Sequence, residues 1–109
     1  MLDIDKNDGV ATLRRLKKGG CVLCQRHTKL TFHHLIPRKM HRRNFFKKHA
    51  DKATLALGIN ICRQCHVGIH KLYDEMTLAK QFNTYAKLTA DPLVAQHVAW
   101  VKKQKIMTK

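Results

Sequence analysis

Acidic residues are scarce in this sequence. Only 7 Asp and Glu stand against 22 Lys and Arg, which leaves a formal net charge of +15 over 109 residues. A charge of about 2–8 is enough to keep a small domain in solution. The excess therefore indicates a polyanionic partner such as nucleic acid. The alternative is a solvated basic surface that serves solubility alone.

Long hydrophobic runs are also missing. No stretch approaches the length of a membrane span. The segment Met1–Lys6 lacks the basic region and apolar run of a secretory signal. We therefore expect a cytoplasmic protein that has no membrane partner, and the sequence gives no indication of a protein partner. Internal repeats and low-complexity segments are absent as well.

The length predicts one domain that comprises residues 1–109. Because a domain of this size buries a modest core, a bound metal would help to stabilise it. Cysteine occurs in two Cys-x-x-Cys pairs, Cys21 with Cys24 and Cys62 with Cys65. In a reducing compartment, two such pairs favour a tetrahedral structural Zn²⁺ over two disulfides or a redox-active pair.

Histidine forms a second candidate set. His66 and His70 are four residues apart, so on a helix both imidazoles lie on one face. Such a pair supplies two of the three protein ligands of an open metal site. The third is expected upstream, where His33 and His34 are adjacent and would point to opposite faces of an extended segment. Four other histidines are interpreted as surface or substrate-near groups: His27, His41, His49 and His97.

The patterning predicts a mixture of helices and strands. A helix over 10–18, capped by Asn7 or Asp8, should end at the Gly19-Gly20 pair. A strand should run from Leu30 into the His pair and end at Pro37. The remaining expected elements are a turn at 21–24, a polar link at 25–29, a strand over 54–61, and helices over about 66–73, 77–89 and 92–105.

The segment 38–52 is dense in positive charge and carries Phe45 and Phe46 at its centre. We interpret it as a basic loop or short helix that contacts the phosphates of a nucleic acid. The alternative is a solvated loop with one buried Phe. The residues predicted to contact nucleic acid are Arg38, Lys39, Arg42, Arg43, Lys47 and Lys48.

Three motifs occur in a fixed order along the chain and together resemble the HNH endonucleases. They are Cys21-x-x-Cys24, His33-His34-Leu35-Ile36-Pro37 and Cys62-x-x-Cys65-His66-x-x-x-His70. The resemblance implies an α+β fold with a small ββα-metal (His-Me finger) core. This core would be a two-stranded antiparallel hairpin plus a helix, at about 21–73, with a structural zinc held by the four cysteines. Flanking helices at about 77–105 also look like those of small HNH proteins.

The resemblance further implies roles for the histidines. His33, His66 and His70 would hold one catalytic divalent metal (Mg²⁺, Mn²⁺, Ni²⁺ or Zn²⁺), and His34 would be the general base. The expected substrate is DNA, mostly duplex and held through its phosphates. Cleavage would leave 5′-phosphate and 3′-hydroxyl ends. The cysteine site would be separate and would pin the first strand against the metal-binding helix.

The sequence departs from the family at its middle residue. Leu57 stands where an HNH enzyme has the Asn that orients the base. Asn60 is the candidate for this catalytic role, although a displaced position in a strand changes the face that a side chain occupies. Asn44, Asn83 or backbone groups are the alternatives.

Two other functions fit part of the sequence. A non-catalytic zinc module that binds nucleic acid would share the charge and the cysteines, but would not require four clustered histidine positions. A nuclease acting on RNA is the third possibility. Aromatic residues make up 6% of the chain and form no interleaved platform for unstacked bases, which argues mildly against single-strand recognition.

Overall fold

Three strands, Lys18–Gly20 (β1), His27–His34 (β2) and Gly58–Cys62 (β3), form an antiparallel sheet in the order β1-β2-β3. This computed structural model describes residues 10–105 and confirms an α+β fold, with a third strand beyond the expected two. The helices are η1 (Arg38–Met40, a 3₁₀ helix), α1 (Asn44–His49), α2 (Lys52–Ala56), α3 (Arg63–Leu72), α4 (Glu75–Gln81), α5 (Tyr85–Ala90) and α6 (Pro92–Lys102).

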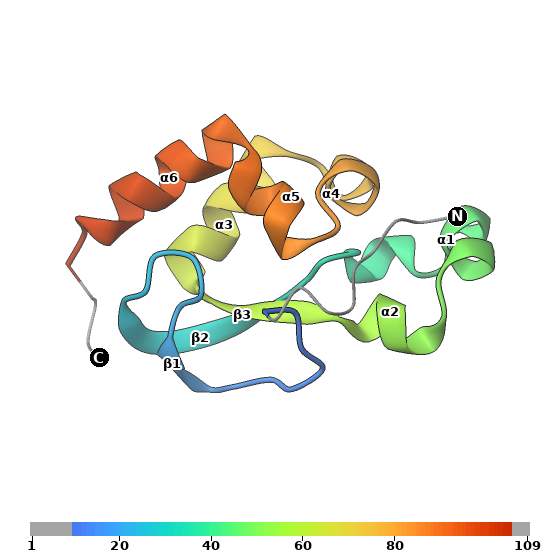
Figure 1. The fold of residues 1–109 in the computed structure, drawn as a ribbon, viewed down its shortest axis with the longest axis horizontal. Coiled ribbons are helices and arrows are strands. Elements are labelled where there is room, and N and C mark those ends of the chain that lie inside the picture. Colours follow the sequence, from blue (N-terminus) through green and yellow to red (C-terminus); the bar gives the residue numbers. More distant parts are fainter. Residues whose placement is uncertain (1–9, 106–109) are drawn as a thin grey trace.

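Helices α3 to α6 gather on one face of the sheet, and α1 and α2 lie at one end of the molecule (Figure 1). The main core fills the space between strand β3 and these helices, with Ile59, Ile61, Ile69, Val94 and Val101 buried. A smaller cluster around Phe46 joins η1, α1 and α4, and its members are Ile36, Met40, Phe46 and Ala79.

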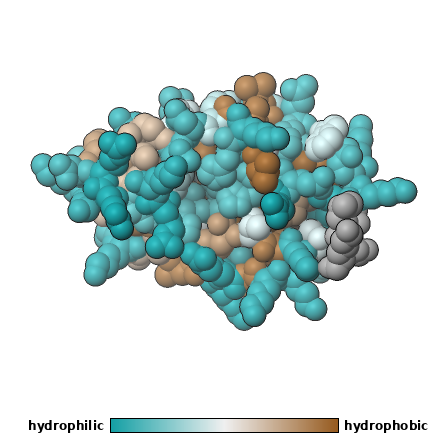
Figure 2. Space-filling view, turned by 180° about the vertical axis from the view of Figure 1, so that it is seen from behind, coloured by the Kyte–Doolittle hydropathy of each residue, from teal (hydrophilic) through white to brown (hydrophobic). Residues whose placement is uncertain are grey.

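Seen from behind, hydrophilic side chains cover most of the surface, and hydrophobic residues show only as small patches (Figure 2). This agrees with the strong excess of Lys and Arg in the sequence. Within residues 10–105, no helix has both the length and the apolar composition that crossing a membrane requires.

The register of β2 and β3 decides which histidine faces the helices. His33 pairs with Ile59, and Phe32 pairs with Asn60. Since side chains alternate along a strand, His33 and Ile59 share the face that packs on α3. His34 lies on the opposite face, as expected for adjacent residues of an extended segment.

The helix predicted over 10–18 is wrong. Thr12 instead bridges to Gly58, and residues 18–20 form β1. The backbone groups of this segment find distant partners, because the Asn60 side chain accepts from Leu16 N and donates to Arg14 O. Tertiary hydrogen bonds therefore override the helical pattern. The predicted caps Asn7 and Asp8 lie outside the described residues.

Three further elements differ from the sequence prediction. The strand predicted over 54–61 begins only at Gly58, because Asp51 caps helix α2 by accepting from Thr54 N. The helix predicted over 77–89 is divided into α4 and α5. Asn83 donates to Ala79 O near the end of α4, and Thr84 caps the start of α5. Strand β2 also begins at His27, inside the predicted polar link.

Candidate metal centres

The four cysteines form one buried cluster, although two of them come from each half of the chain. Cys21 and Cys24 lie in the turn between β1 and β2, while Cys62 ends β3 and Cys65 lies in the first turn of α3. All four side chains are at most 3% exposed, and their sulfur atoms lie within 4.8 Å of one another.

The sulfur spacing suits a tetrahedral metal. The Sγ atoms of Cys21 and Cys65 are 3.9 Å apart, and those of Cys24 and Cys62 are 3.7 Å apart. A zinc tetrathiolate with Zn–S bonds of about 2.3 Å has S–S edges of about 3.8 Å. A disulfide would need about 2.05 Å. The cluster therefore fits a structural metal such as zinc.

Backbone groups shape each half of this cluster. Cys24 N donates to the sulfur of Cys21, and Cys65 N donates to the sulfur of Cys62, which also caps helix α3. Gln25 follows the first pair with φ of 67°, the left-handed conformation that closes the turn. Hydrogen bonding to Cys21 lowers the pKa of the Cys62 thiol, while hydrogen bonding to Cys62 raises the pKa of Cys21 and hydrogen bonding to Cys21 raises the pKa of Cys65. The thiols of the cluster therefore share hydrogen bonds and do not lose their protons independently.

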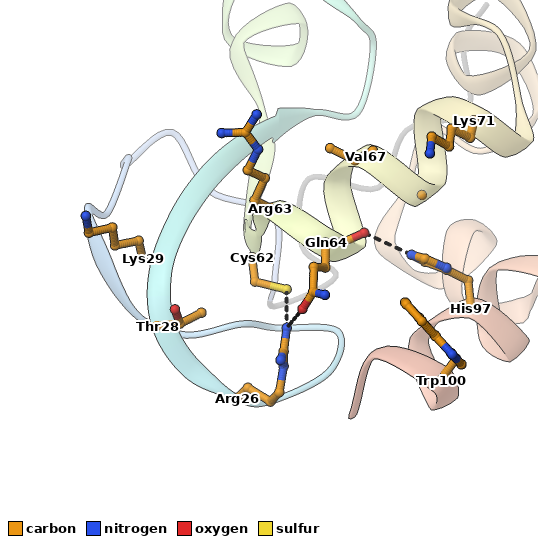
Figure 3. A pocket seen from close by; sticks show the side chains of 11 residues that line it. Arg26, Thr28, Lys29, Cys62, Arg63, Gln64, Val67, Lys71, His97 and Trp100 are labelled. Atoms are coloured by element: carbon orange, nitrogen blue, oxygen red, sulfur yellow. Dashed lines mark hydrogen bonds between the residues drawn. The ribbon is translucent and has the colours of Figure 1, made fainter. Parts of the chain in front are cut away.

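Arg26 supports the cysteine cluster from outside. Its guanidinium lies 3.5 Å from the sulfurs of both Cys24 and Cys62, and it also donates to the Gln64 side chain and to Gln104 O. Figure 3 shows the contacts with Cys62 and Gln64. Four thiolates around one divalent ion leave two negative charges, so a fixed cation beside two of the sulfurs stabilises the loaded site.

We expect Arg26→Met to weaken metal retention by about 10–100-fold, the usual loss when an outer hydrogen-bond partner of a metal ligand is removed. Arg26→Lys should lose less, because it keeps the charge without the planar fork. Zinc transfer to a chromophoric chelator measures the effect. Arg63→Met is the matched control, since Arg63 is exposed. If Arg63→Met and Arg26→Met released zinc at the same rate, Arg26 would not stabilise the metal-loaded cluster.

Three histidines form the second cluster. His33 comes from β2, and His66 and His70 come from consecutive turns of α3. The ring of His33 lies 5.2 Å from that of His66 and 5.3 Å from that of His70, measured between centroids. One nitrogen from each residue lies within 4.8 Å of the others, which brings the three sequence candidates together.

His33 gives this cluster its clearest sign of a ligand. Its side chain is fully buried, and neither ring nitrogen has a hydrogen-bond partner among the described residues. Leaving buried polar atoms unpaired costs free energy, so native proteins rarely do so. A cation between His33, His66 and His70 would satisfy one of these nitrogens, so the donor set fits a divalent metal.

The protonation states of the three histidines also suit metal binding. Burial lowers the pKa of His33 to about 3 and that of His66 to about 4, and it also lowers the pKa of His70. The neighbouring imidazoles add to the effect at His33 and His66, because two positive charges repel each other there. All three rings are therefore neutral at pH 7, which is the form that coordinates metals.

Thr31 fixes the orientation of His66. Its hydroxyl lies 2.9 Å from Ile61 O and 2.8 Å from Nδ1 of His66. Since the carbonyl can only accept, Thr31 donates to Ile61 and accepts from the Nδ1–H of His66. The Nε2 atom of His66 then carries the lone pair that can bind a metal. Sequence analysis did not identify Thr31, although its position two residues before His33 places it on the same face of β2.

His34, the predicted base, lies on the other face of β2 beside different groups. Its ring packs at 5.1 Å from Phe32 and at 5.6 Å from His41, between centroids. Burial, followed by the positive charge of Arg15, lowers its pKa to about 4. The ring is therefore a neutral proton acceptor at pH 7.

Asn60, the predicted partner of His34, forms its side-chain hydrogen bonds with other residues. Its carboxamide binds the backbone of Arg14 and Leu16, so it secures the N-terminal segment to β3. His34 packs instead against Phe32 and His41, and Nε2 of His41 donates to Ile36 O at 2.7 Å. The sequence prediction had treated His41 as an ordinary residue. Asn44 begins α1, and Asn83 is buried beside α4.

The predicted phosphate-contacting residues all have exposed side chains. Arg38 lies near enough to His34 to contribute to its lowered pKa. The others extend from η1 to α1, at the end of the molecule away from α6 (Figure 1). Phe46 anchors this segment in the smaller core, whereas Phe45 is 42% exposed. The predicted phosphate-contacting residues that extend from η1 to α1 are Lys39, Arg42, Arg43, Lys47 and Lys48.

Comparison with known proteins identifies a relative in a bacterium. No family model matches this chain, and no solved structure matches it. The chain is 36% identical over 87 residues to the uncharacterized protein YisB of Bacillus subtilis strain 168. The match covers 79% of this chain and 76% of YisB. Similarity of this extent over most of both chains means that the protein belongs to the YisB family.

Proposed function

We propose that this chain is a metal-dependent DNA endonuclease of the HNH type, which hydrolyses phosphodiester bonds in the reducing cytoplasm. The observation that carries the proposal is the buried imidazole of His33. Among the described residues its two nitrogens have no hydrogen-bond partner, and it lies against His66 and His70 in a cluster of neutral rings. A module that only binds nucleic acid has no need for such a cluster.

His33, His66 and His70 would hold the divalent ion, with Thr31 keeping Nε2 of His66 available as the ligand atom. When bound, the ion would stabilise the negative charge that develops on the phosphate and the leaving oxygen. Three protein ligands leave further coordination positions for substrate oxygens. The ion would be one of Mg²⁺, Mn²⁺, Ni²⁺ and Zn²⁺.

His34 would act as the general base. A ring nitrogen accepts a proton from water, the water oxygen forms a bond to phosphorus, and the bond from phosphorus to the 3′ oxygen breaks. The 3′ oxygen takes up a proton, so the products carry a 5′-phosphate and a 3′-hydroxyl. The neutral state of His34 at pH 7 and its place next to the ligand His33 support this role.

Positive charge beside His34 supports duplex DNA as the substrate. Arg15 and Arg38 contribute to the local potential at His34, and the exposed basic residues of η1 and α1 extend it along the surface. Contacts of this kind hold phosphates and carry little sequence information. We therefore propose that the protein binds duplex DNA mainly through its backbone.

The cysteine cluster would hold a structural zinc. It joins the turn before β2 to the start of α3, and thereby fixes the two elements that carry the three histidines. In a protein of this size a metal constraint supplements a small core.

Plasmid cleavage tests the proposal. Purified protein should nick supercoiled DNA only when Mg²⁺, Mn²⁺, Ni²⁺ or Zn²⁺ is added, and the cut ends should accept ligation, which requires a 5′-phosphate. His33→Ala should abolish nicking, whereas His27→Ala is the control because His27 is exposed and outside the cluster.

The rival function is a non-catalytic zinc module that binds nucleic acid. The engagement of Asn60 by the N-terminal segment favours it, because the usual partner of the base is then missing. Retardation of DNA in a gel, combined with intact plasmid under every ion tested, would establish this function and exclude the nuclease.

A further inference from the structure

A groove of about 450 Å³ lies between α3, α6 and the start of β2, and it borders the cysteine cluster at Cys62 (Figure 3). Its lining combines cationic, polar and apolar side chains and includes no Asp or Glu. The residues on which the argument depends are Arg63, Val67, Lys71, His97 and Trp100.

Trp100 offers a fixed aromatic surface in this groove. Its side chain is 54% exposed, and its ring stacks on His97 with centroids 5.9 Å apart and planes inclined by 26°. His97 is itself held, because its Nε2 donates to Gln64 O at 2.9 Å. A Cβ at position 68 would collide with the His97 ring, so Gly68 is what allows this ring to lie against α3.

The charges of the groove select an anion. Arg63 and Lys71 are exposed residues of α3 and line it together with the apolar Val67. Arg26 also lines it, but its guanidinium is engaged by cysteine sulfurs and by Gln64. Since no acidic residue is present in the lining, an occupant with negative charge and a flat apolar face fits best.

The groove continues toward the histidine cluster. Val67 and Lys71 line both the groove and a second hollow that includes His66 and His70. A chain that passes over Lys71 from one hollow to the other would carry consecutive phosphates past both. Because the two hollows adjoin, one nucleic-acid strand could occupy the groove and the histidine site at the same time.

We propose that the groove binds an unpaired nucleotide of the nucleic-acid substrate, with its base stacked on Trp100 and its phosphate beside Arg63 and Lys71. The place of this nucleotide next to the cut phosphate rests on the nuclease function proposed above, whereas its binding does not. An exposed ring accepts a flat base only when that base is not already stacked inside a duplex. This narrows the duplex substrate proposed above to duplex DNA that carries a single-stranded segment beside it.

Trp100 is the sole tryptophan of the chain, so its fluorescence reports on this groove alone. Short oligothymidylate should quench the emission, while a blunt duplex with the same number of phosphates should quench it much less. The titration is made without added divalent ions, so that cleavage does not interfere. Leu93→Ala should give the same quenching as the wild type, because Leu93 is an exposed residue of α6 outside the groove.

Variants test the contact by anisotropy of a labelled oligothymidylate. Trp100→Leu should weaken single-strand binding by about 10-fold or more, as expected for loss of one stacked base. Trp100→Phe should retain most of the affinity. Leu93→Ala is the matched control, since Leu93 is a similarly exposed apolar residue of α6 outside the groove. A combined Arg63→Gln and Lys71→Gln variant should also bind more weakly.

The outcomes separate this proposal from the nuclease. Quenching by single strands, with weaker binding by Trp100→Leu, supports the groove even when no ion permits cleavage. Plasmid nicking without such quenching, or equal quenching by the duplex, overturns the groove and leaves the nuclease intact. Displacement of the oligonucleotide by polyglutamate of equal charge would overturn base stacking and identify an acidic peptide as the occupant.

Discussion

His34→Ala is expected to lower plasmid nicking by about 10²–10⁴-fold, the usual contribution of a general base. His70→Ala is also expected to lower nicking, but through weaker binding of the divalent ion. The two losses should respond differently to concentration. Raising Mg²⁺ or Mn²⁺ should restore part of the activity of His70→Ala and none of that of His34→Ala.

This difference follows from the two faces of β2. His70 contacts His33 in the three-histidine cluster, whereas His34 contacts Phe32 and His41 on the opposite face. Nicking rates measured over a titration of the ion give the comparison, and His27→Ala provides the unaffected reference. Recovery of His34→Ala at high metal concentration would assign His34 to metal binding and remove it as the base.

The second large effect is expected at the cysteine cluster. Cys62→Ser should remove the bound metal and unfold the protein, because structural zinc contributes about 10–16 kcal/mol at neutral pH in small zinc-binding domains. This is as large as the total stability of a typical domain, which is about 5–15 kcal/mol. Cys62 also caps α3, and serine can keep this cap, so the expected loss comes from the missing metal ligand.

Elemental analysis and thermal melting measure this outcome. Wild-type protein should contain one zinc per chain that survives mild chelation, and Cys62→Ser should contain none. The matched comparison is wild-type protein stripped with a strong chelator at low pH, which should melt like the variant. A well-folded wild type that contains no metal would show that the cluster is a packed set of thiols.

Local spacing was sufficient to predict much of both clusters. Cys62 with Cys65 and His66 with His70 are near neighbours in sequence, so the turn and helix geometry alone brings each pair together. The strand alternation likewise separated His33 from His34. Pairing the two cysteine halves needed only the expectation that four thiolates share one metal. The convergence of three histidines was therefore predictable, although their role as ligands stays a prediction.

The remaining features depend on contacts between distant residues, which local patterns do not contain. Asn60 binds the backbone 44 residues away at Leu16, and this contact replaces the helix predicted at 10–18. Arg26 reaches Gln64, 38 residues along the chain. His41 comes to lie against His34 only because η1 turns the chain back after Pro37. Each of these is fixed by tertiary packing and not by periodicity.

The close approach of α3 and α6 has a consequence for divergence within the family. Glycine inside a helix costs about 1 kcal/mol relative to alanine, yet position 68 tolerates no Cβ while His97 lies against it. Substitutions at these two positions are therefore epistatic. A lineage can exchange Gly68 for a better helix former only if His97 is replaced by a smaller residue or its ring turns away, and either change removes the support behind Trp100.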